Sequence, residues 1–444
     1  MKIKTLEYKL VGEGKNSRLV ASLNIDGCID FTQTEAIIGL YPIGYFWGKV
    51  SNVLTDWLCI SAIVYSIDRD FDRHKYSCDG WSRDFVVTFK VICPEIFNNL
   101  SGQIESMLAF LTGDYWKCRF VENKAMPEIK FRETKLFDGI TQVNLFSGGL
   151  DSLIGFVDYI STNPKGKLFL ASHYDHFMTG PKSDQQKILK NIPAEYQNRY
   201  LSIGAIHITP KHSKELTCRS RSLMFLAIAL LVAAYTGTSI VVPENGPVSL
   251  NYPLSPSRRA ACSTRTTHPI FLSKFTAILK EQGITISITN PYEFKTKGEM
   301  VKDCSNKELL MKLAFISNSC GKRSQHQFML DDPHATHCGR CMPCMYRKAS
   351  LLGFDDKTTY GITLPTLFSL KDKDMSNDFY AMLNYLKRNL TEEEIIKELH
   401  IAGLTKLPHF YEYVELVKRT RSELKQLILQ EGSDDILKYV GLQI

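Results

Sequence analysis

The sequence predicts an α/β protein with a doubly wound parallel sheet, and three observations support this fold class. From Thr141 onward, strand-like apolar runs alternate with helix-like stretches, and such repeated βα units form parallel sheets with right-handed crossovers. A glycine-rich turn joins the first of these strands to the next helix, as is usual where such sheets bind ligands. The chain has 444 residues, 44% of them hydrophobic, which is enough to bury the cores of two or three domains.

Three regions with different patterns divide the chain. Residues 1–138 are expected to form a separate α+β domain, residues 139–354 the α/β domain, and residues 355–444 a mostly helical C-terminal region. In the first region, runs of β-forming residues predict strands, and apolar residues at helical spacing predict one helix. The strands are expected over residues 19–25, 57–67, 85–92 and 115–121, and the helix over residues 95–111.

A densely charged segment, residues 68–74, lies between two of the strands expected in the first region. Its composition is typical of a solvent-exposed hairpin loop, because charged side chains are costly to bury. The alternative is a docking surface for a partner protein, and the sequence leaves both interpretations open.

The α/β region supplies the strands whose C-terminal ends would form one cleft. Strands are expected over residues 143–146, 168–172, 203–209, 239–242 and 284–289, and helices over residues 151–160, 185–190, 221–235 and 269–281. In doubly wound sheets, ligands bind outside the carboxyl ends of the strands. The loops that begin at Ser147, His173, Pro210, Pro243 and Asn290 are therefore expected to face a common cleft.

The C-terminal region shows two helix signals. Thr391 followed by Glu394 is a capping box at a helix N-terminus, and residues 410–430 form a long amphipathic stretch. No side-chain pattern in this region indicates chemistry, so a structural or oligomer-forming role is expected.

Bulk properties exclude several classes of protein. The net charge of +7 is spread along the chain without a Lys/Arg cluster, so no direct nucleic-acid binding is expected. The longest apolar run, residues 223–235, is too short to span a bilayer, and the first residues lack the apolar core of a signal peptide. Without an export signal, the cysteines are expected to be reduced and the protein to be cytoplasmic.

The segment Ser147-Gly148-Gly149-Leu150-Asp151-Ser152 carries the strongest functional signal. It follows a short strand and precedes a helix, an order that aims main-chain N–H groups of the helix N-terminus at an anion. The glycines permit close approach of the anion, and the two serines can add hydroxyl donors. Asp151 would repel a bare phosphate, so we expect it to hold Mg²⁺ or to orient the loop. The spacing differs from the Walker pattern.

Four cysteines within residues 320–344 indicate a zinc site. Cys338, Cys341 and Cys344 are separated by two-residue gaps that let thiolates surround one tetrahedral ion, and Cys320 completes a four-sulfur set. With no position left for water, such a site would be structural. Two competing ligands, which the four sulfurs make unnecessary, are His334 and His337.

Two pairs of residues offer polar side chains to the expected cleft. Arg219 and Arg221 stand at the entrance of a helix, where guanidinium groups could bind a polyphosphate or a carboxylate. Glu244 and Asn245 follow a strand and could hold a purine-like edge or a metal. The alternative is that the arginines pair with acidic groups on the surface and that the loop is simply capped.

Two further segments are suited to anions. Arg265, Thr266 and His268 precede a helix and offer a cation, a hydroxyl and an imidazole. His268, with an ordinary pKa of about 6.5, is a candidate acceptor for the proton of an attacking amine. Lys297 follows the last strand and could stabilise pyrophosphate or an oxyanion, and Glu299 lies two residues further on.

These motifs resemble a known family. The loop resembles the PP-loop of the N-type ATP pyrophosphatases, and the loop, the 297–299 stretch and the four cysteines together resemble the 7-cyano-7-deazaguanine synthase (QueC) family over roughly residues 141–354. The resemblance implies an adenine-nucleotide alpha-hydrolase-like fold and adenylation of the carboxylate of 7-carboxy-7-deazaguanine by ATP, with release of pyrophosphate. In that family, ammonia then gives the amide, and a second ATP-dependent step gives the nitrile.

Pattern and resemblance together define the candidate residues. The candidate catalytic residues are Asp151, Lys297, His268 and Arg219. Binding of ATP and Mg²⁺ is expected of Ser147, Gly148, Gly149, Leu150, Asp151, Ser152 and Arg221. Substrate binding is expected of Glu244, Asn245, Arg265, Thr266 and Glu299, and zinc binding of Cys320, Cys338, Cys341 and Cys344.

The chain departs from the stand-alone family, which has different loops at 244–246 and 263–268 and lacks both the first 138 residues and the C-terminal region. In these respects it is similar to the larger QueC-like proteins of bacterial anti-phage systems, such as QatC of the Qat system and its counterpart in type IV CBASS. Those relatives match residues 79–83, 110–116, 243–246 and 263–269. That resemblance implies an amide product, with an amine of a partner protein in place of ammonia.

The leading hypothesis is therefore an ATP-dependent ligase that joins the deazaguanine carboxylate to an amine of a partner protein docked on residues 1–138. The second hypothesis is a nitrile-forming synthase that uses ammonia. The third is a non-catalytic nucleotide-binding scaffold in a defence complex. tRNA thiolation or lysidine formation would require a basic RNA-binding face, which the sequence lacks.

Overall fold

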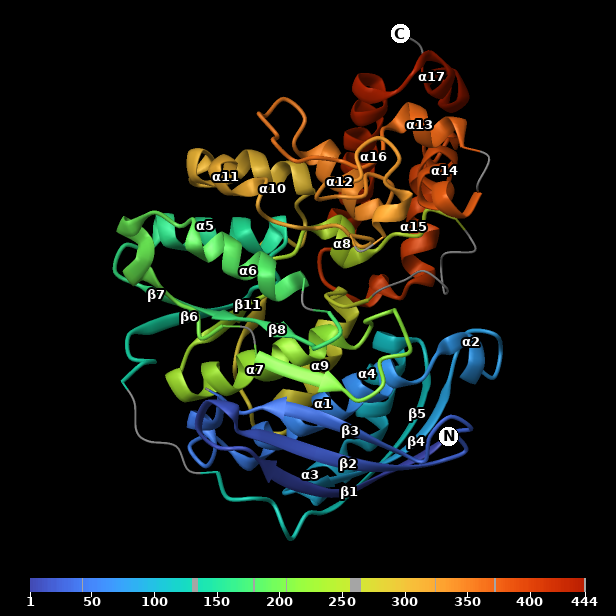
Figure 1. Cartoon of the computed structure of the whole chain (residues 1–444). Helices are drawn as coiled ribbons and strands as arrows, with labels where there is room; N and C mark the ends of the chain where they lie inside the picture. The colour runs from blue at the N-terminus through green and yellow to red at the C-terminus, as the bar shows by residue number, and fades with distance from the viewer. Residues whose placement is uncertain are drawn as a thin grey trace.

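Two β-sheets, with helices between and around them, form the body of the protein, and a helical region covers one end (Figure 1). The computed structural model describes residues 1–41, 43–129, 135–178, 180–204, 206–255, 265–323, 325–370 and 373–442. The protein is therefore an α/β protein, as predicted, with one mixed and one parallel sheet.

The larger sheet has seven strands in the order β5-β4-β1-β2-β3-β10-β8. They are β1 (Lys2–Val11), β2 (Arg18–Asp26), β3 (Gln33–Gly39), β4 (Asp84–Val91), β5 (Tyr115–Glu122), β8 (His173–Tyr174) and β10 (Ile206–Pro210). β1, β2 and β3 are antiparallel neighbours, and β4 is parallel to both β1 and β5. Buried residues alternate with more exposed ones along these strands, so one face of the sheet packs against helices.

The smaller sheet has five strands in the order β12-β11-β6-β7-β9, and every pairing in it is parallel. Its strands are β6 (Ile140–Leu145), β7 (Lys167–Ala171), β9 (Tyr200–Leu201), β11 (Ser239–Val241) and β12 (Ile288–Thr289). The parallel sheet of alternating β and α units is thus present, with β6 at its centre.

One predicted strand belongs to the other sheet. The strand expected over residues 203–209 exists as β10, but it pairs antiparallel with β3, with Ile208 opposite Ile38, and parallel with β8. The first 138 residues therefore share a sheet with the following region, and one hydrophobic cluster extends from Ile3 to Leu279. The pattern of β-forming residues predicts the strand over residues 203–209 but not its pairing with β3.

Four helices lie between the two sheets: α1 (Asn52–Asp70), α4 (Ser101–Thr112), α7 (Arg221–Thr236) and α9 (Pro269–Glu281) (Figure 1). The strand predicted over residues 57–67 is wrong, because this stretch is the centre of α1. Every residue of α1 from Val53 to Asp70 is buried, so the helix has no polar face and no helical periodicity. Its β-branched and aromatic residues then suggest a strand.

The opposite face of the parallel sheet is covered by α5 (Leu150–Thr162) and α6 (Gly180–Lys190), with α10 (Lys297–Asp303) and α11 (Lys307–Ala314) beyond α5 (Figure 1). The helix predicted over residues 95–111 is divided into α3 (Pro94–Asn99) and α4. A short helix, α2 (Arg73–Tyr76), precedes β4. Short 3-10 turns complete the body at 14–16, 43–46, 194–199, 326–328 and 404–406.

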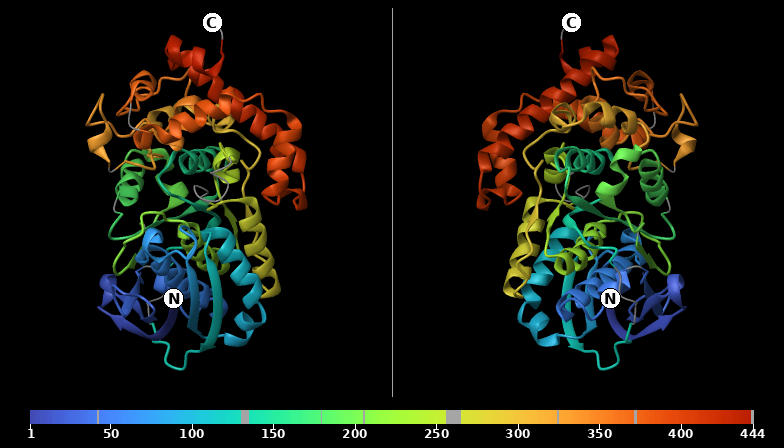
Figure 2. Two further views of the ribbon diagram at one scale, coloured as in Figure 1. Left: turned by 90° about the vertical axis from the view of Figure 1, so that its right-hand side faces the viewer. Right: turned by 90° about the vertical axis from the view of Figure 1, so that its left-hand side faces the viewer.

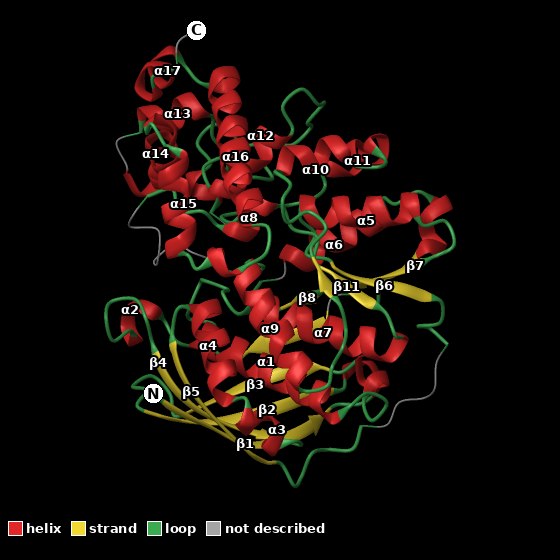
Figure 3. Ribbon diagram, turned by 180° about the vertical axis from the view of Figure 1, so that it is seen from behind, coloured by secondary structure: helices red, strands yellow, loops and turns green. Residues whose placement is uncertain are grey.

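The C-terminal region is helical, as predicted, and lies at the end of the molecule away from the larger sheet (Figures 2 and 3). It contains α13 (Leu364–Ser369), α14 (Lys373–Lys387), α15 (Glu392–Ile401), α16 (Phe410–Glu431) and α17 (Asp434–Val440). Two helices from earlier in the chain, α8 (Gly246–Leu250) and α12 (Met342–Ser350), pack against α16. The capping box of Thr391 and Glu394 is confirmed. In the described part of the chain, no helix is long and apolar enough to cross a membrane.

The charged segment 68–74 is neither a solvated loop nor an open docking surface at its core, because four of its charged residues are buried. Arg83 donates to Asp68 Oδ1 at 2.7 Å and to Asp114 Oδ2 at 2.8 Å, and Arg73 donates to the same two carboxylates. The arginines lower the pKa of Asp114, although burial alone would raise it. The remaining Asp68 oxygen accepts from the Ser220 N–H at 2.9 Å and from the Ser220 hydroxyl at 2.8 Å, at the start of α7. The network thus joins the N-terminal segment to a helix that reaches the cleft.

Candidate functional site

The loop between β6 and α5 has the geometry expected of an anion site. Gly148 adopts φ +87°, and a Cβ there would lie 3.2 Å from the Asp184 Cβ and from a backbone nitrogen, so glycine is required. The Gly148 N–H donates to the Ser152 hydroxyl at 3.2 Å, and the Gly149 N–H donates to the Ser147 hydroxyl at 3.3 Å. These long bonds to serine oxygens can be exchanged for bonds to an anion.

A buried cluster stands behind the loop, around Asp151. Lys297 Nζ lies 2.5 Å from Asp151 Oδ1, and Asn245 Nδ2 donates to Asp151 Oδ2 at 2.7 Å. Burial would raise the pKa of Asp151, but the charge of Lys297 and hydrogen bonds from its neighbours hold it below the usual range. The pKa of Glu244 is raised well above its usual range, by burial and then by the charge of Asp151. The raised pKa favours the protonated form of Glu244, which could donate to Asp151.

The cleft consists of two adjoining cavities of about 370 and about 300 Å³. Both are bordered by Ser147, Ser152, Arg221, Pro243 and Glu244. The larger cavity continues toward the cysteine cluster, and the smaller one has apolar walls from the ends of β6 and β11 and from α7. The strand ends after β6 and β11 therefore meet in one cleft, as predicted.

The two arginines at the entrance of α7 face different surroundings. Arg221 borders both cavities, and in the described part of the chain its guanidinium makes no hydrogen bond or ion pair, only a ring contact with Phe225 at 5.3 Å. Arg219 is buried, donates to the Thr112 carbonyl at 3.2 Å and stacks over Trp81 at 4.6 Å. Burial lowers the pKa of Arg219 to about 10. Arg221 is thus placed to meet an anion, whereas Arg219 is not brought to the cleft.

The segment before α9 contributes less than expected. Thr266 borders the smaller cavity, but Ser263 and Thr264 lie outside the described residues. His268 is the N-cap of α9, and its Nδ1 accepts from a backbone N–H at 3.2 Å. Burial, with the charge of Arg265, lowers the pKa of His268 to about 3. Both His268 and Arg265, which stacks on Phe110, border a separate cavity. The structure does not bring the predicted base to the cleft.

The C-terminal helix α16 supports the helix that carries Lys297. Glu423 on α16 accepts from the Thr296 hydroxyl and from the Gly298 N–H at 3.4 Å. A Cβ at Gly298 would lie 2.4 Å from a Glu423 oxygen, so the approach is close. Glu299 caps α10 and pairs with Arg419 of α16 at 2.8 Å, so it faces away from the cleft. Glu299 borders neither cavity of the cleft.

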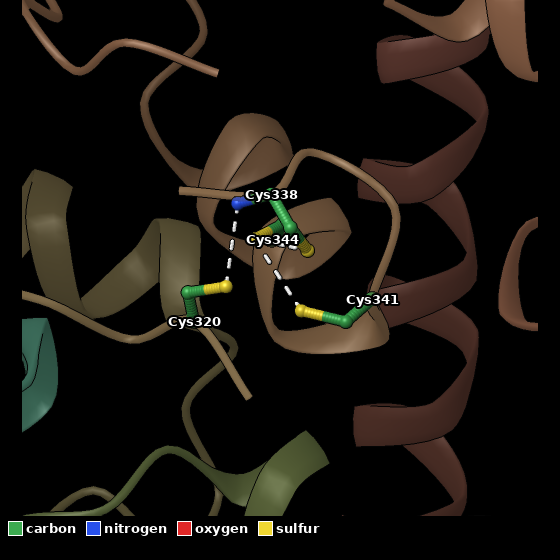
Figure 4. Close-up of side chains that lie close together, drawn as sticks. All are labelled: Cys320, Cys338, Cys341 and Cys344. Carbon is green, nitrogen blue, oxygen red and sulfur yellow. Dashed lines mark hydrogen bonds between the residues drawn. The ribbon is translucent and has the colours of Figure 1, made fainter. Parts of the chain in front are cut away.

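The four predicted cysteines come together. Their sulfur atoms lie within 4.8 Å of one another, and the Cys341 and Cys338 sulfurs lie 3.4 and 3.8 Å from the Cys344 sulfur (Figure 4). A tetrahedral zinc with Zn–S bonds of about 2.3 Å needs sulfurs about 3.8 Å apart, so the set fits zinc. Backbone N–H groups also point at the sulfurs, from Cys338 to the Cys320 sulfur at 3.3 Å and from Arg340 to the Cys338 sulfur at 3.4 Å. Such donors favour thiolates.

The two neighbouring histidines are outside the sulfur set. His334 is exposed, and His337 is fully buried with Nε2 accepting from the Ser319 N–H at 3.3 Å. Burial and the charge of Arg347 lower the pKa of His337 to about 3, so it is a neutral acceptor.

Two residues beside the loop escaped the sequence analysis. The Asn318 N–H donates to the Gly148 carbonyl at 3.0 Å, and the Leu150 N–H donates to the Ser319 hydroxyl at 3.2 Å. They immediately precede Cys320, and only this adjacency to a predicted metal ligand could have indicated them.

These features define an α/β protein with a glycine-rich loop in a cleft and, beside it, a four-cysteine cluster that could hold a metal ion. No protein-family model, no curated protein and no solved structure matches the chain.

Proposed function

We propose that the protein is an ATP-dependent ligase that adenylates a carboxylate and passes the acyl group to an amine. One observation carries this proposal: the loop N–H groups, Lys297 and Arg221 border one cleft at the ends of β6 and β11, and among the described residues the Arg221 guanidinium has no hydrogen-bond or ion-pair partner. The loop suits the phosphates of ATP, and the two cations suit a pentavalent phosphorus and the departing pyrophosphate. The loop sequence supports the finer assignment to the PP-loop class, which cleaves ATP between the α- and β-phosphates.

The reaction has two steps. In the first, a carboxylate oxygen attacks the α-phosphorus, the bond to the β-phosphate oxygen breaks, and pyrophosphate leaves. In the second, an amine nitrogen attacks the acyl carbon, AMP leaves with the bonding pair, and the amine loses one proton. Asp151 offers carboxylate oxygens that would hold Mg²⁺, which would neutralise phosphate charge, and Glu244 could join it only by losing its proton. Asp151 also fixes the position of Lys297.

For the acyl substrate and the acceptor we propose 7-carboxy-7-deazaguanine and an amine of a partner protein in a bacterial anti-phage system. The resemblance to the larger QueC-like defence proteins supports both assignments. The smaller cavity, at about 300 Å³ and with apolar walls, is large enough for a bicyclic base. The buried charged residues of segment 68–74 are not part of the proposed docking surface for the partner protein. His268 is not the proposed base, because it does not border the cleft.

The test combines product analysis with intact-mass spectrometry. Full-length protein is incubated with ATP, Mg²⁺ and 7-carboxy-7-deazaguanine, with and without the protein encoded beside it. We expect AMP and pyrophosphate, and on the partner a mass increase equal to the acid minus water. Asp151→Asn should abolish both products, whereas the exposed change Asp355→Asn should not. Release of ADP and phosphate would contradict adenylation, and free 7-cyano-7-deazaguanine formed from ammonia would favour the nitrile synthase.

A further inference from the structure

The segment before Cys320 forms a wall of the cleft directly beside the glycine-rich loop. Asn318, Ser319 and Cys320 all border the larger cavity. The backbone of this segment is bonded to the loop, because the Asn318 N–H donates to the Gly148 carbonyl at 3.0 Å. The loop and the wall therefore cannot move independently.

The Ser319 hydroxyl occupies the place of an anion oxygen. It accepts at 3.2 Å from the N–H of Leu150, the first residue of α5. The first N–H groups of a helix have no partner within the helix and are the groups that bind anions. A hydroxyl can also donate, so when a phosphate oxygen takes the Leu150 N–H, the displaced hydroxyl can turn and donate to the same phosphate.

The cysteine cluster holds Ser319 from two sides. Ser319 is covalently adjacent to Cys320, whose sulfur accepts from the Lys322 N–H at 3.4 Å and from the Cys338 N–H at 3.3 Å. The Ser319 N–H donates to His337 Nε2 at 3.3 Å, and His337 immediately precedes Cys338. A metal bound by the four sulfurs would thus fix both groups that set the position of Ser319.

We propose that Ser319 is a further phosphate-binding residue and that the metal centre holds it in place, so that metal binding and nucleotide binding are thermodynamically coupled. This inference rests on the proposed nucleotide site. It gives the cysteine cluster a role in ligand affinity in addition to its role in folding. Coupling is reciprocal: the factor by which the metal tightens the nucleotide is the factor by which the nucleotide tightens the metal.

The test measures both affinities on full-length protein. The probe is the α,β-methylene analogue of ATP with Mg²⁺, which cannot be cleaved to AMP. Its dissociation constant is measured for the wild type, Ser319→Ala, Ser319→Thr and the control Ser369→Ala, an exposed change in α13. Zinc affinity is then measured by competition with a chelator, first without the analogue and then with it. The analogue concentration is chosen so that the same fraction of each variant is bound to the analogue. Circular dichroism follows the fold throughout.

We expect Ser319→Ala to weaken the analogue about tenfold, the loss of one hydrogen bond to a charged group, and Ser319→Thr to restore binding. The analogue should raise the zinc affinity of the wild type, the threonine variant and the control by about tenfold, and raise that of Ser319→Ala by less. If removal of zinc unfolds the protein, every variant gains the same ligand-dependent factor at equal saturation, and the coupling then runs through folding and not through Ser319. Equal factors in Ser319→Ala and the wild type would overturn the inference. No binding of the analogue to the wild type would instead overturn the proposed function.

Discussion

Glu244 gives a quantitative test of the electrostatics of the cleft. Burial and the charge of Asp151 raise its pKa well above the usual range, so we expect it to be protonated at pH 7. A carboxyl with an ordinary pKa of about 4.3 that stays protonated at pH 7 costs at most about 3.7 kcal/mol of folding free energy. Because Glu244 borders the cleft, water screens part of this cost, and we expect about 1–2 kcal/mol.

The change Glu244→Gln removes this cost, because the glutamine amide replaces the protonated carboxyl and can still donate to Asp151. The sign follows from linkage. When the pKa of a carboxyl group is higher in the folded than in the unfolded state, its contribution to folding stability is fully present below the unfolded pKa of about 4.3. That contribution is lost as the pH rises through the folded-state pKa. The wild type should therefore lose stability relative to Glu244→Gln from pH 5 to pH 7, by at most about 1.4 kcal/mol per pH unit.

The assay is urea unfolding of zinc-loaded protein at pH 5, 6, 7 and 8 without added Mg²⁺. Glu244→Gln should be about 1–2 kcal/mol more stable than the wild type at pH 7 and nearly equal at pH 5. The control Glu13→Gln, an exposed change in the turn after β1, should show no such trend. A variant that is less stable at pH 7, or a difference independent of pH, would show that Glu244 is ionised and would refute this account of the cluster.

The remaining predictions concern the metal, the anion site, the N-cap and the N-terminal strands. Cys341→Ser should lower bound zinc measured by atomic absorption and reduce soluble yield; full zinc in soluble variant protein would contradict the four-sulfur centre. Arg221→Gln should weaken nucleotide binding in calorimetry about tenfold but change stability by less than about 0.5 kcal/mol, since its guanidinium has no partner in the described residues. His268→Ala should lower the free energy of unfolding by about 1 kcal/mol, because α9 loses its N-cap, and His268→Asn should lower it by less. Both variants should keep turnover, and a loss of turnover in His268→Asn would support the histidine as the base. Deletion of residues 1–122 should give insoluble protein, because β10 loses β3; a soluble remainder that still forms AMP would show an independent unit.

The glycine-rich loop and the cysteine cluster were predictable because each is a local pattern. Neighbouring residues fix the turn at Gly148 and the two-residue gaps of the cysteines, so the chain nearby determines their geometry. The same holds for the capping box at Thr391, whose partner is three residues away. Features whose geometry is set by neighbouring residues can therefore be predicted from the sequence.

The errors came from partners far away in the chain. Segment 68–74 was interpreted as exposed because its charges need several distant groups to be buried, including Asp114 and Ser220, and no local pattern announces them. Arg219 and Arg221 look equivalent in sequence, but two residues at a helix entrance face different directions. The α1 helix looked like strand because both of its faces are covered.

The pairing of β3 with β10 has a consequence for synthesis on the ribosome. β3 ends at Gly39, whereas β10 begins at Ile206 and α7 ends at Thr236, so most of the chain must emerge before α1 is enclosed. Until then, a helix that is buried on every side in the folded protein and an open strand edge are exposed to solvent for about ten seconds or more at usual elongation rates. The nascent chain should therefore depend on chaperones over this interval, and slow codons between positions 40 and 206 should lower its soluble yield.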